Sequence, residues 1–370
     1  MPSPLRPHCT ARERLLRWSP LTSPSNLALP PAQQSLIFEV LARSLAPGTL
    51  ETYGLGVLLF HVMCDAQGIA ENDRAPASRN VISVFIAELA GRYSESAVRN
   101  AMAGVRAWHT LHRHLWLADD REVDTLVRAA ARLALPKRAP QPAFSLDDLK
   151  NIAGRLDWSI SLDVAVRAAL LVCFWGTAQL GELLPRTLAG AAGFNPAHCI
   201  TTRHITYKQD AAGNSVSVLH IPQTKIEPVA GEDIYWGPRS DVLDATTALQ
   251  DHLDVNKPSV SQHLFGYLDK NKKLKTLTKS ALLSRLKVAA LVASTTLVPG
   301  HSIRISSTTH FLLSGLSFDA VRVKGRWASD SFILYLRRHT EIMAQYLQED
   351  AHVHSEVLRR TAVLMPVARH

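Results

Sequence analysis

The sequence predicts a mainly α-helical protein with a small antiparallel sheet, organised as a helical N-terminal domain followed by a larger mixed α+β domain. Three observations predict this fold class. Apolar residues recur every three or four positions over residues 33–135, and the pattern changes to period two within residues 199–236. Between the two helical stretches, residues 136–143 form a basic, proline-rich linker. The length of 370 residues also fits two domains.

The first domain is expected to be a compact helical unit of residues 33–135. Residues 1–32 contain seven prolines and little periodicity, which predicts a disordered N-terminal tail with a slight positive charge. Ser78 and Ser94 are the expected N-caps of two helices. The segments with helical periodicity are 35–45, 49–68, 78–91 and 94–115.

The second domain is expected to span residues 144–348, with a C-terminal tail over 349–370. Residues 199–236 predict a three-stranded antiparallel meander with turns near 210–214 and 227–231. The apolar spacing over residues 341–370 fits a helix that docks on a partner subunit or one that packs on its own domain. The other predicted elements are helices at 240–255 and 278–296, a short strand or turn at 264–268, and further helices over 301–348.

Composition narrows the class of partner and the compartment. The formal net charge of +9 favours a polyanionic partner, most often nucleic acid. The four cysteines lie far apart without a CxxC pair, which argues against a disulfide framework or a structural zinc site and fits a reducing compartment. No apolar run reaches the roughly 18–20 residues of a membrane span, and the N-terminus lacks a secretory h-region. We therefore expect a protein that is neither secreted nor membrane-bound and that holds no metal.

Several chemically suggestive residues follow one another in a fixed order. His301 and Arg304 lie three apart after a Pro-Gly helix start, so both side chains can reach one anion. Residues 325–337 read GRWASDSFILYLR, which places Tyr335 eight residues after Trp327. Lys225 lies in the turn between the second and third predicted strands. Taken singly, these are equally well a helix-start pair, core aromatic side chains and a solvated lysine.

Together, these pieces resemble the tyrosine recombinase (phage integrase-like) superfamily over residues 33–348. The GRWASDSFILYLR segment is most similar to the eukaryotic mobile-element branch, which includes Cryptons and DIRS-type elements. The resemblance implies a SAM-like helical core-binding domain and a tyrosine recombinase catalytic domain. It also implies a reaction without metal or cofactor, in which a tyrosine hydroxyl attacks a DNA phosphodiester and forms a 3′-phosphotyrosyl bond.

The resemblance assigns a role to each residue that matches the motifs. Tyr335 resembles the nucleophile, and Arg304 resembles a clamp on the reacting phosphate. His301 is similar to the donor or base beside that phosphate, and Lys225 to the general acid that protonates the leaving 5′-oxygen. Trp327 occupies the position from which an indole N–H donates to a phosphate oxygen.

One position departs from the family pattern. The family has Gly-x-Arg-x-x-Glu where this chain has Glu182 in place but Gln179 at the arginine position. Glutamine supplies neither charge nor a bidentate fork, and losing such a cation costs roughly 10²- to 10⁵-fold in rate. Whether the chain is an enzyme is therefore open between a slowed recombinase and an inactive mobile-element remnant that only binds DNA. A related tyrosine topoisomerase is a third interpretation, which the helical first domain disfavours.

Basic residues in two places predict contacts with double-stranded DNA. Lys137 and Arg138 lie in the linker, and the run from Lys270 to Lys287 contains no acidic residue. The resemblance also implies a tetramer on DNA, and work in the nucleus if the source is a eukaryote, otherwise in the cytoplasm. The predicted DNA-contacting residues of the run are Lys270, Lys272, Lys273, Lys275, Lys279, Arg285 and Lys287.

Overall fold

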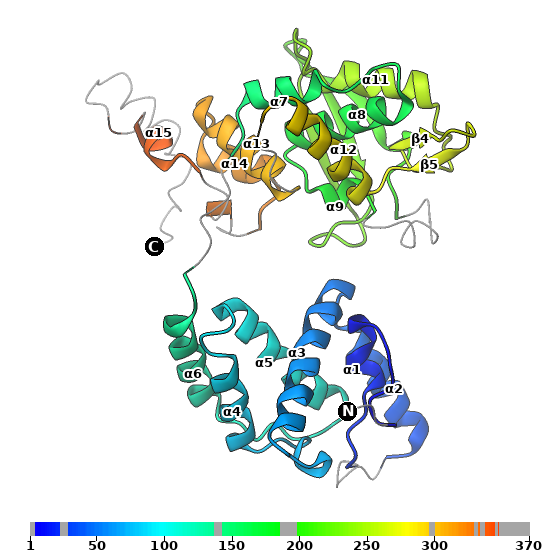
Figure 1. The fold of residues 1–370 in the computed structure, drawn as a ribbon. Coiled ribbons are helices and arrows are strands. Elements are labelled where there is room, and N and C mark those ends of the chain that lie inside the picture. Colours follow the sequence, from blue (N-terminus) through cyan, green and yellow to red (C-terminus); the bar gives the residue numbers. More distant parts are fainter. Residues whose placement is uncertain are drawn as a thin grey trace, which may run out of the picture. The chain divides into compact units, whose positions relative to one another are not determined.

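The structure is a computed structural model in which the chain divides into two compact units, Met1–Ala139 and Pro140–His370 (Figure 1). The boundary falls inside the segment 136–143 where the sequence analysis places the linker. Lys137, Arg138, Tyr335 and the tail over 349–370 lie outside the described residues. The structure describes residues 4–22, 29–136, 143–185, 198–295, 300–328, 332–333, 337–344 and 347.

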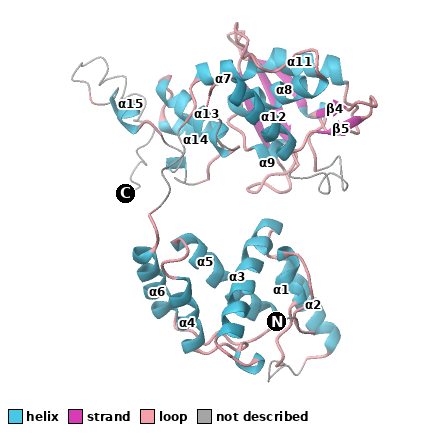
Figure 2. Cartoon of the chain, in the orientation of Figure 1, coloured by secondary structure: helices cyan, strands magenta, loops and turns pink. Residues whose placement is uncertain are grey.

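Unit 1 is helical throughout its described part (Figure 2). Its helices are α1 (Arg14–Arg17), α2 (Pro31–Arg43), α3 (Pro47–Ala66), α4 (Arg79–Leu89), α5 (Glu95–Leu111) and α6 (Asp120–Leu133), with the short 3₁₀ turns η1 (Ala11–Glu13) and η2 (Glu71–Asp73). The predicted caps are confirmed, because the hydroxyls of Ser78 and Ser94 accept hydrogen bonds from the backbone N–H groups of Val81 and Ala97. The main packing in the unit is α3 against α5.

The prediction of a disordered tail over residues 1–32 is wrong where the structure describes that segment. Leu15 and Trp18 are buried in the core of unit 1, and Trp108 Nε1 donates a 2.7 Å hydrogen bond to the Trp18 carbonyl. Gly54 of α3 permits η1 to approach, since a Cβ there would lie 1.8 Å from a backbone carbonyl oxygen of η1. Proline content predicted disorder, but burial of two large apolar side chains offsets the entropy of ordering the segment.

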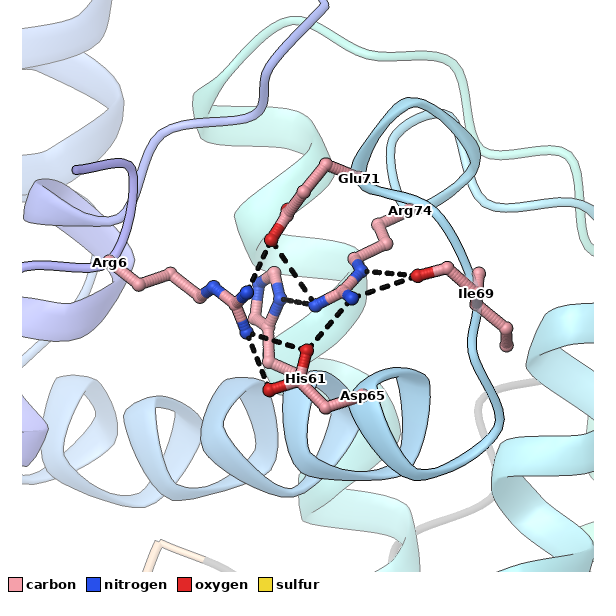
Figure 3. Close-up of polar contacts among 6 residues, drawn as sticks. All are labelled: Arg6, His61, Asp65, Ile69, Glu71 and Arg74. Carbon is pink, nitrogen blue, oxygen red and sulfur yellow. Dashed lines mark hydrogen bonds and ion pairs between the residues drawn. The ribbon is translucent and has the colours of Figure 1, made fainter. Parts of the chain in front are cut away.

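A buried charge cluster also ties the N-terminal segment to α3 (Figure 3). Arg6 donates to Asp65 at 3.1 Å and to Glu71, and Arg74 Nη2 donates to Asp65 at 2.8 Å. Arg74 Nη1 lies 3.2 Å from His61 Nδ1, and because arginine only donates, this nitrogen of His61 must accept. The two arginine side chains are 9% and 6% exposed, so both charges depend on these carboxylates.

Acidification is expected to destabilise unit 1 through His61. Burial, and then the charges of Arg6 and Arg74, lower the pKa of His61 to about 3. The unfolded-state pKa is about 6.5. Between these values the unfolded chain binds a proton that the folded chain does not. The contribution of neutral His61 to the free energy of unfolding is therefore fully present above about pH 6.5, and it falls by about 1 kcal/mol per pH unit toward pH 3. Urea unfolding of the wild-type chain and His61→Gln at pH 7, 5 and 4 should show a weaker pH dependence in the variant. Identical dependence would contradict this assignment.

Unit 2 combines α-helices with two small antiparallel sheets (Figure 2). The predicted meander is confirmed, with strands β1 (Ile205–Gln209), β2 (Ser215–Ile221) and β3 (Glu232–Trp236) in the order β1-β2-β3. Neither unit has, within the described ranges, a helix long and apolar enough to cross a membrane. The helices are α7 (Leu146–Ala153), α8 (Ser161–Trp175), α9 (Leu180–Leu183), α11 (Ala245–Asn256), α12 (Lys279–Val292), α13 (His301–Leu313), α14 (Phe318–Lys324) and α15 (His339–Ala344), and η3 (Thr202–His204) precedes β1.

The second sheet consists of β4 (Gly266–Leu268) paired with β5 (Leu274–Thr276). The sequence predicts only its first strand, as a strand or turn at 264–268. A three-residue strand is too short for period-two alternation to be recognisable, and β5 lies inside a lysine-rich run. The lysines that the sequence analysis treats as one basic run therefore divide between a hairpin and the helix α12.

Two central helices of unit 2 determine where the candidate site lies. Every residue of α8 from 163 to 175 is buried. The Thr177 hydroxyl, just after α8, lies 2.9 Å from the Ser307 hydroxyl of α13 and fixes the α8–α9 corner to that helix. Gly300 permits α9 to approach the start of α13, since a Cβ there would lie 2.6 Å from Leu180 Cδ1. The Gln179–Glu182 segment is thereby held beside the N-terminal end of α13.

The last described helix, α15, packs on its own unit. Ile342 is buried together with Leu312, Val321 and Phe332 in a small apolar cluster. Of the two alternatives for residues 341–370, packing on the own domain is therefore what the structure shows for Ile342. Most of that segment lies outside the described residues.

Candidate active site

The N-terminal end of α13 carries the first pair of candidate residues. The helix begins at His301, with Gly300 as N-cap, as the Pro-Gly pair predicted. His301 is exposed, whereas Arg304 is only 2% exposed. Partial burial of the imidazole lowers the pKa of His301, and the charges of Arg304, Lys279 and Arg337 lower it further. The ring is therefore neutral near pH 7, with one donor and one acceptor nitrogen.

Trp327 lies against the Arg304 guanidinium. The guanidinium carbon is 4.3 Å from the indole centroid, a cation–π arrangement, and Arg304 Nη2 donates to the Gly325 carbonyl. A Cβ on Gly325 would lie 1.7 Å from the indole Cζ3, so glycine is required here. The indole also packs on Phe332, with ring centroids 6.0 Å apart. Trp327 is thus an aromatic that positions Arg304, and its N–H contact with a phosphate stays a prediction.

Glu182 accepts from the Gln179 backbone and from a second arginine. Its Oε2 atom accepts from the Gln179 backbone N–H at 2.8 Å and from Arg326 Nη2 at 2.5 Å. Gln179 is the exposed N-cap residue of α9. Arg326 is 8% exposed, and its Nε lies 3.6 Å from Glu232 Oε2 of β3. The cation at the Glu182 carboxylate therefore comes from position 326 and not from position 179.

Charged side chains from several segments act on Cys173, near the C-terminal end of α8. Burial raises the pKa of the Cys173 thiol to about 12; Glu182 raises it further, whereas Arg304, Arg326 and Lys279 lower it. One buried atom thus feels charges from four separate segments. We define the cation cluster as Lys279, Arg304 and Arg326, together with Arg337, whose charge acts on His301.

Lys279 reaches the cation cluster from the first turn of α12. Its backbone N–H donates a 2.9 Å hydrogen bond to the Pro185 carbonyl, just after α9. Its Cε atom lies 3.4 Å from where a Cβ on Gly300 would stand. The sequence analysis treats Lys279 as part of a DNA-contacting run, whereas the structure places it beside His301.

Two carboxylates of the described residues, those of Glu182 and Glu232, form ion pairs with one member of the cation cluster, Arg326. Next to these cations, the neutral imidazole of His301 offers a donor and an acceptor. Such an arrangement suits a phosphate diester, whose two free oxygens accept hydrogen bonds from guanidinium and ammonium groups.

Of the two remaining predicted catalytic residues, the structure places one in an exposed loop and does not describe the other. Lys225 is exposed in the loop between β2 and β3, where the Thr224 hydroxyl accepts a 3.0 Å hydrogen bond from the Glu227 N–H. Tyr335 lies outside the described residues. The described residues on either side of it do belong to the region: Phe332 packs on Trp327, and the charge of Arg337 lowers the pKa of His301.

The predicted DNA-contacting lysines gather mainly on one hairpin. We define the basic hairpin as Lys270, Lys272, Lys273 and Lys275, all exposed on or between β4 and β5 (Figure 1). Asp269 shapes its tip by accepting from two backbone N–H groups at 2.8 and 3.0 Å, and it also pairs with Lys275 at 3.1 Å. Lys287 is exposed on α12.

Arg285 differs from the other members of the predicted DNA-contacting run. Its guanidinium pairs at 2.6 Å with Asp163, whose side chain is 2% exposed. This ion pair joins α12 to α8, and loss of Arg285 would leave the buried Asp163 carboxylate without its partner. We therefore leave it out of the proposed DNA surface.

Sequence reasoning missed the place of Arg326 and Arg337 in the site. Both stand in the GRWASDSFILYLR segment, next to residues that received a role. The available signal was their adjacency to Trp327 and Tyr335. A role for Arg326 follows only from the fold, which brings it to Glu182, 144 residues away in the chain.

Comparison with known proteins identifies the fold. No family model and no curated protein matches the sequence. A solved structure of the XerH site-specific recombinase bound to its palindromic difH substrate, a post-cleavage complex, superposes with a TM-score of 0.55 at 11% identity, covering 92% of this chain and 94% of that one. The pre-cleavage complex of XerH on difH gives a TM-score of 0.53 at 10% identity, with coverage of 92% and 94%. Similarity at these identities bears on the fold alone, and this chain has the tyrosine recombinase fold.

Proposed function

We propose that this protein binds double-stranded DNA and breaks and rejoins it through a 3′-phosphotyrosyl intermediate on Tyr335. The observation that carries the proposal is the placement of basic side chains at the start of α13: Arg304 lies against Trp327, Arg326 is held by Glu182, and Lys279 approaches Gly300 beside His301. Guanidinium and ammonium groups in this arrangement suit a phosphate diester. Support comes from the fold, which resembles that of a recombinase solved on its DNA substrate. Further support comes from the described residues near Tyr335 in the chain, since Phe332 packs on Trp327 and the charge of Arg337 lowers the pKa of His301.

The proposed reaction assigns each bond and proton. The Tyr335 oxygen bonds to phosphorus, the bond from phosphorus to the 5′-oxygen breaks, and His301 takes the phenolic proton. Lys225 gives a proton to the leaving 5′-oxygen, which requires its exposed loop to approach the DNA. Arg304 and Lys279 stabilise the charge on the pentacoordinate phosphate. A 5′-hydroxyl of a second strand then reverses the step.

Covalent trapping on a pool of DNA tests this proposal without knowledge of the target. Nicked duplexes with random flanks are incubated with the wild-type chain, Gln179→Arg and Tyr335→Phe. Protein-linked DNA is then retained under denaturing conditions and sequenced. We expect enriched flanking sequences with the wild type or Gln179→Arg, and none with Tyr335→Phe. Equal recovery with Tyr335→Phe would contradict the assigned nucleophile.

A catalytically silent DNA-binding protein is the second candidate, and the observation that favours it is Gln179. Phosphate-backbone affinity comes from many dispersed cations and does not need an arginine at that position. This alternative predicts sequence-independent binding by the wild type and no protein-linked DNA. An adduct that appears only with Gln179→Arg would assign the natural chain to this class.

Neutralising the basic hairpin should weaken DNA binding uniformly across sequences. The double variant Lys272→Gln, Lys273→Gln is expected to lower the slope of log affinity against log salt by about 1.8, since each lost phosphate contact contributes about 0.9. The matched control neutralises the exposed Lys150 and Lys208, which lie outside the hairpin. Fluorescence anisotropy on two unrelated duplexes at several salt concentrations measures both slopes. A loss confined to one duplex would instead indicate base readout.

The segment 325–337 supports placing the protein in the eukaryotic mobile-element branch, with Crypton and DIRS-type elements. In a eukaryotic cell its site of action would be the nucleus, and the resemblance implies a tetramer on DNA. Light scattering of the chain with and without a duplex selected from the pool tests the assembly. A complex that stays at one protomer per duplex would contradict it.

A further inference from the structure

The Glu182 carboxylate is occupied by a guanidinium, although the position three residues earlier holds glutamine. Arg326 Nη2 donates to Glu182 Oε2 at 2.5 Å, and the same oxygen accepts from the Gln179 N–H at 2.8 Å. A carboxylate that holds a guanidinium by a charge-assisted hydrogen bond fixes its orientation. Arg326 is thus oriented beside the backbone of the residue that lacks the cation.

Arg326 is also linked to the other buried arginine of the cation cluster. Arg304 Nη2 donates to the carbonyl of Gly325, which belongs to the peptide bond that joins Gly325 to Arg326. The side chain of Trp327, on the other side of Arg326, stacks on the Arg304 guanidinium at 4.3 Å. The Arg304 guanidinium therefore contacts the residues on both sides of Arg326 in the turn over residues 325–327.

Much of the hydrogen-bonding capacity of Arg326 is unused among the residues that the structure describes. Its side chain is 8% exposed, and neither Nε nor Nη1 donates a hydrogen bond to any residue that the structure describes. Oε2 of Glu232 lies 3.6 Å from Nε, which is ion-pair distance but does not make a hydrogen bond. Arginine does not deprotonate in proteins, so this side chain remains a buried cation with donors to spare.

Two further features indicate a constrained, positively charged residue. The backbone of Arg326 has φ of 56°, in the left-handed region that costs a non-glycine residue roughly 1 kcal/mol or more. Burial, and then the charge of Arg326, lower the pKa of Lys324 to about 8.

We propose that Arg326 binds the reacting DNA phosphate together with Arg304, and supplies the guanidinium that is missing at position 179. The inference rests on the proposed function and names a further catalytic residue of that site. Phosphate oxygens would accept from Nε or Nη1 of Arg326 while Glu182 holds Nη2. Because Nε and Nη1 are buried, this contact requires the turn to open toward the DNA. In the competing interpretation Arg326 has a structural role only, because its ion pairs with Glu182 and Glu232 link the turn to α9 and β3.

A reciprocal rescue separates the two interpretations. The whole chain is prepared as wild type, Arg326→Gln, Gln179→Arg and the double variant Arg326→Gln, Gln179→Arg, and each is compared by thermal melting. Adduct formation is measured on nicked duplexes selected from the pool, and binding is measured against salt on the same duplexes. We expect Arg326→Gln to lower adduct formation by about 10²-fold or more, and Gln179→Arg to restore it in that background.

Three results would overturn the proposal. The first is adduct formation by Arg326→Gln within about threefold of the wild type. The second is a loss of adduct formation in a normally folded Arg326→Gln that Gln179→Arg does not restore. The third is a loss of adduct formation that thermal destabilisation of the variant explains by itself. If neither the wild type nor Gln179→Arg forms an adduct, the proposed cleavage fails by itself. Binding then decides the role of Arg326. A salt slope about 0.9 smaller in Arg326→Gln, restored in the double variant, supports a phosphate contact. An unchanged slope overturns it.

Discussion

Replacing Arg304 with glutamine is expected to slow adduct formation by about 10³-fold, the range found when a positioned transition-state cation or donor is removed. Arg304 is 2% exposed, lies under Trp327 and adjoins His301 on the same helix. Its guanidinium therefore acts in a dry environment, where charge on the pentacoordinate phosphate is poorly screened. The measurement is the initial rate of protein–DNA adduct on a nicked duplex selected by the wild-type chain.

The control for Arg304→Gln is Arg203→Gln, which removes an exposed arginine of η3. It should leave the rate of adduct formation within about twofold, since surface substitutions seldom matter. Arg304→Gln also leaves the Gly325 carbonyl without its donor, which costs about 1–3 kcal/mol of stability. Assays must run below the melting temperature of the variant. A folded Arg304→Gln that forms adducts at the wild-type rate would contradict the site.

Replacing Gly325 with alanine should have the second largest effect. The new Cβ would lie 1.7 Å from the Trp327 indole, so the ring must leave its place on Arg304. Overpacking of this kind costs about 1–3 kcal/mol in the free energy of unfolding. Adduct formation should fall by about 10²-fold, because Arg304 and Arg326 flank the displaced turn. Urea unfolding and the trapping assay measure the two effects.

Gly181→Ala is the matched control for this substitution, since a Cβ at Gly181 in α9 meets nothing within 4 Å. Alanine is the better helix former, so this variant should be as stable as the wild type or more stable by up to about 1 kcal/mol. Equal stability of Gly325→Ala and Gly181→Ala would show that the indole is not confined as the structure has it.

Periodicity predicted the architecture because long amphipathic segments carry many matching positions. The helices α3, α5 and α13 and the meander β1-β2-β3 follow from spacing and caps. The N-terminal segment was mispredicted because composition averages over residues, whereas docking depends on Leu15, Trp18 and the ion pairs of Arg6. These contacts join residues far apart in the chain and leave no local pattern.

The site was predictable only where its residues stand in a contiguous motif. His301 and Arg304 stand in one short motif and Trp327 in a second, and the structure brings the two motifs together. That Gln179 stands where the family pattern has an arginine was inferred from its local context, and it stays a prediction. The pairing of Arg326 with Glu182 was not foreseen, because it depends on the α8–α9 corner being fixed to α13. Lys279 was assigned to the predicted DNA-contacting run because its position beside Gly300 likewise depends on the fold and not on its neighbours in the sequence.

The most direct test of the central claim is mass spectrometry of the trapped protein–DNA adduct. After digestion with nuclease and trypsin, the peptide of residues 327–337 contains Tyr335 as its single tyrosine. The account predicts that this peptide carries a nucleotide attached through its 3′-phosphate to the Tyr335 oxygen. Trapped protein whose nucleotide is attached to any other residue, or whose 327–337 peptide is unmodified, would contradict the proposed function.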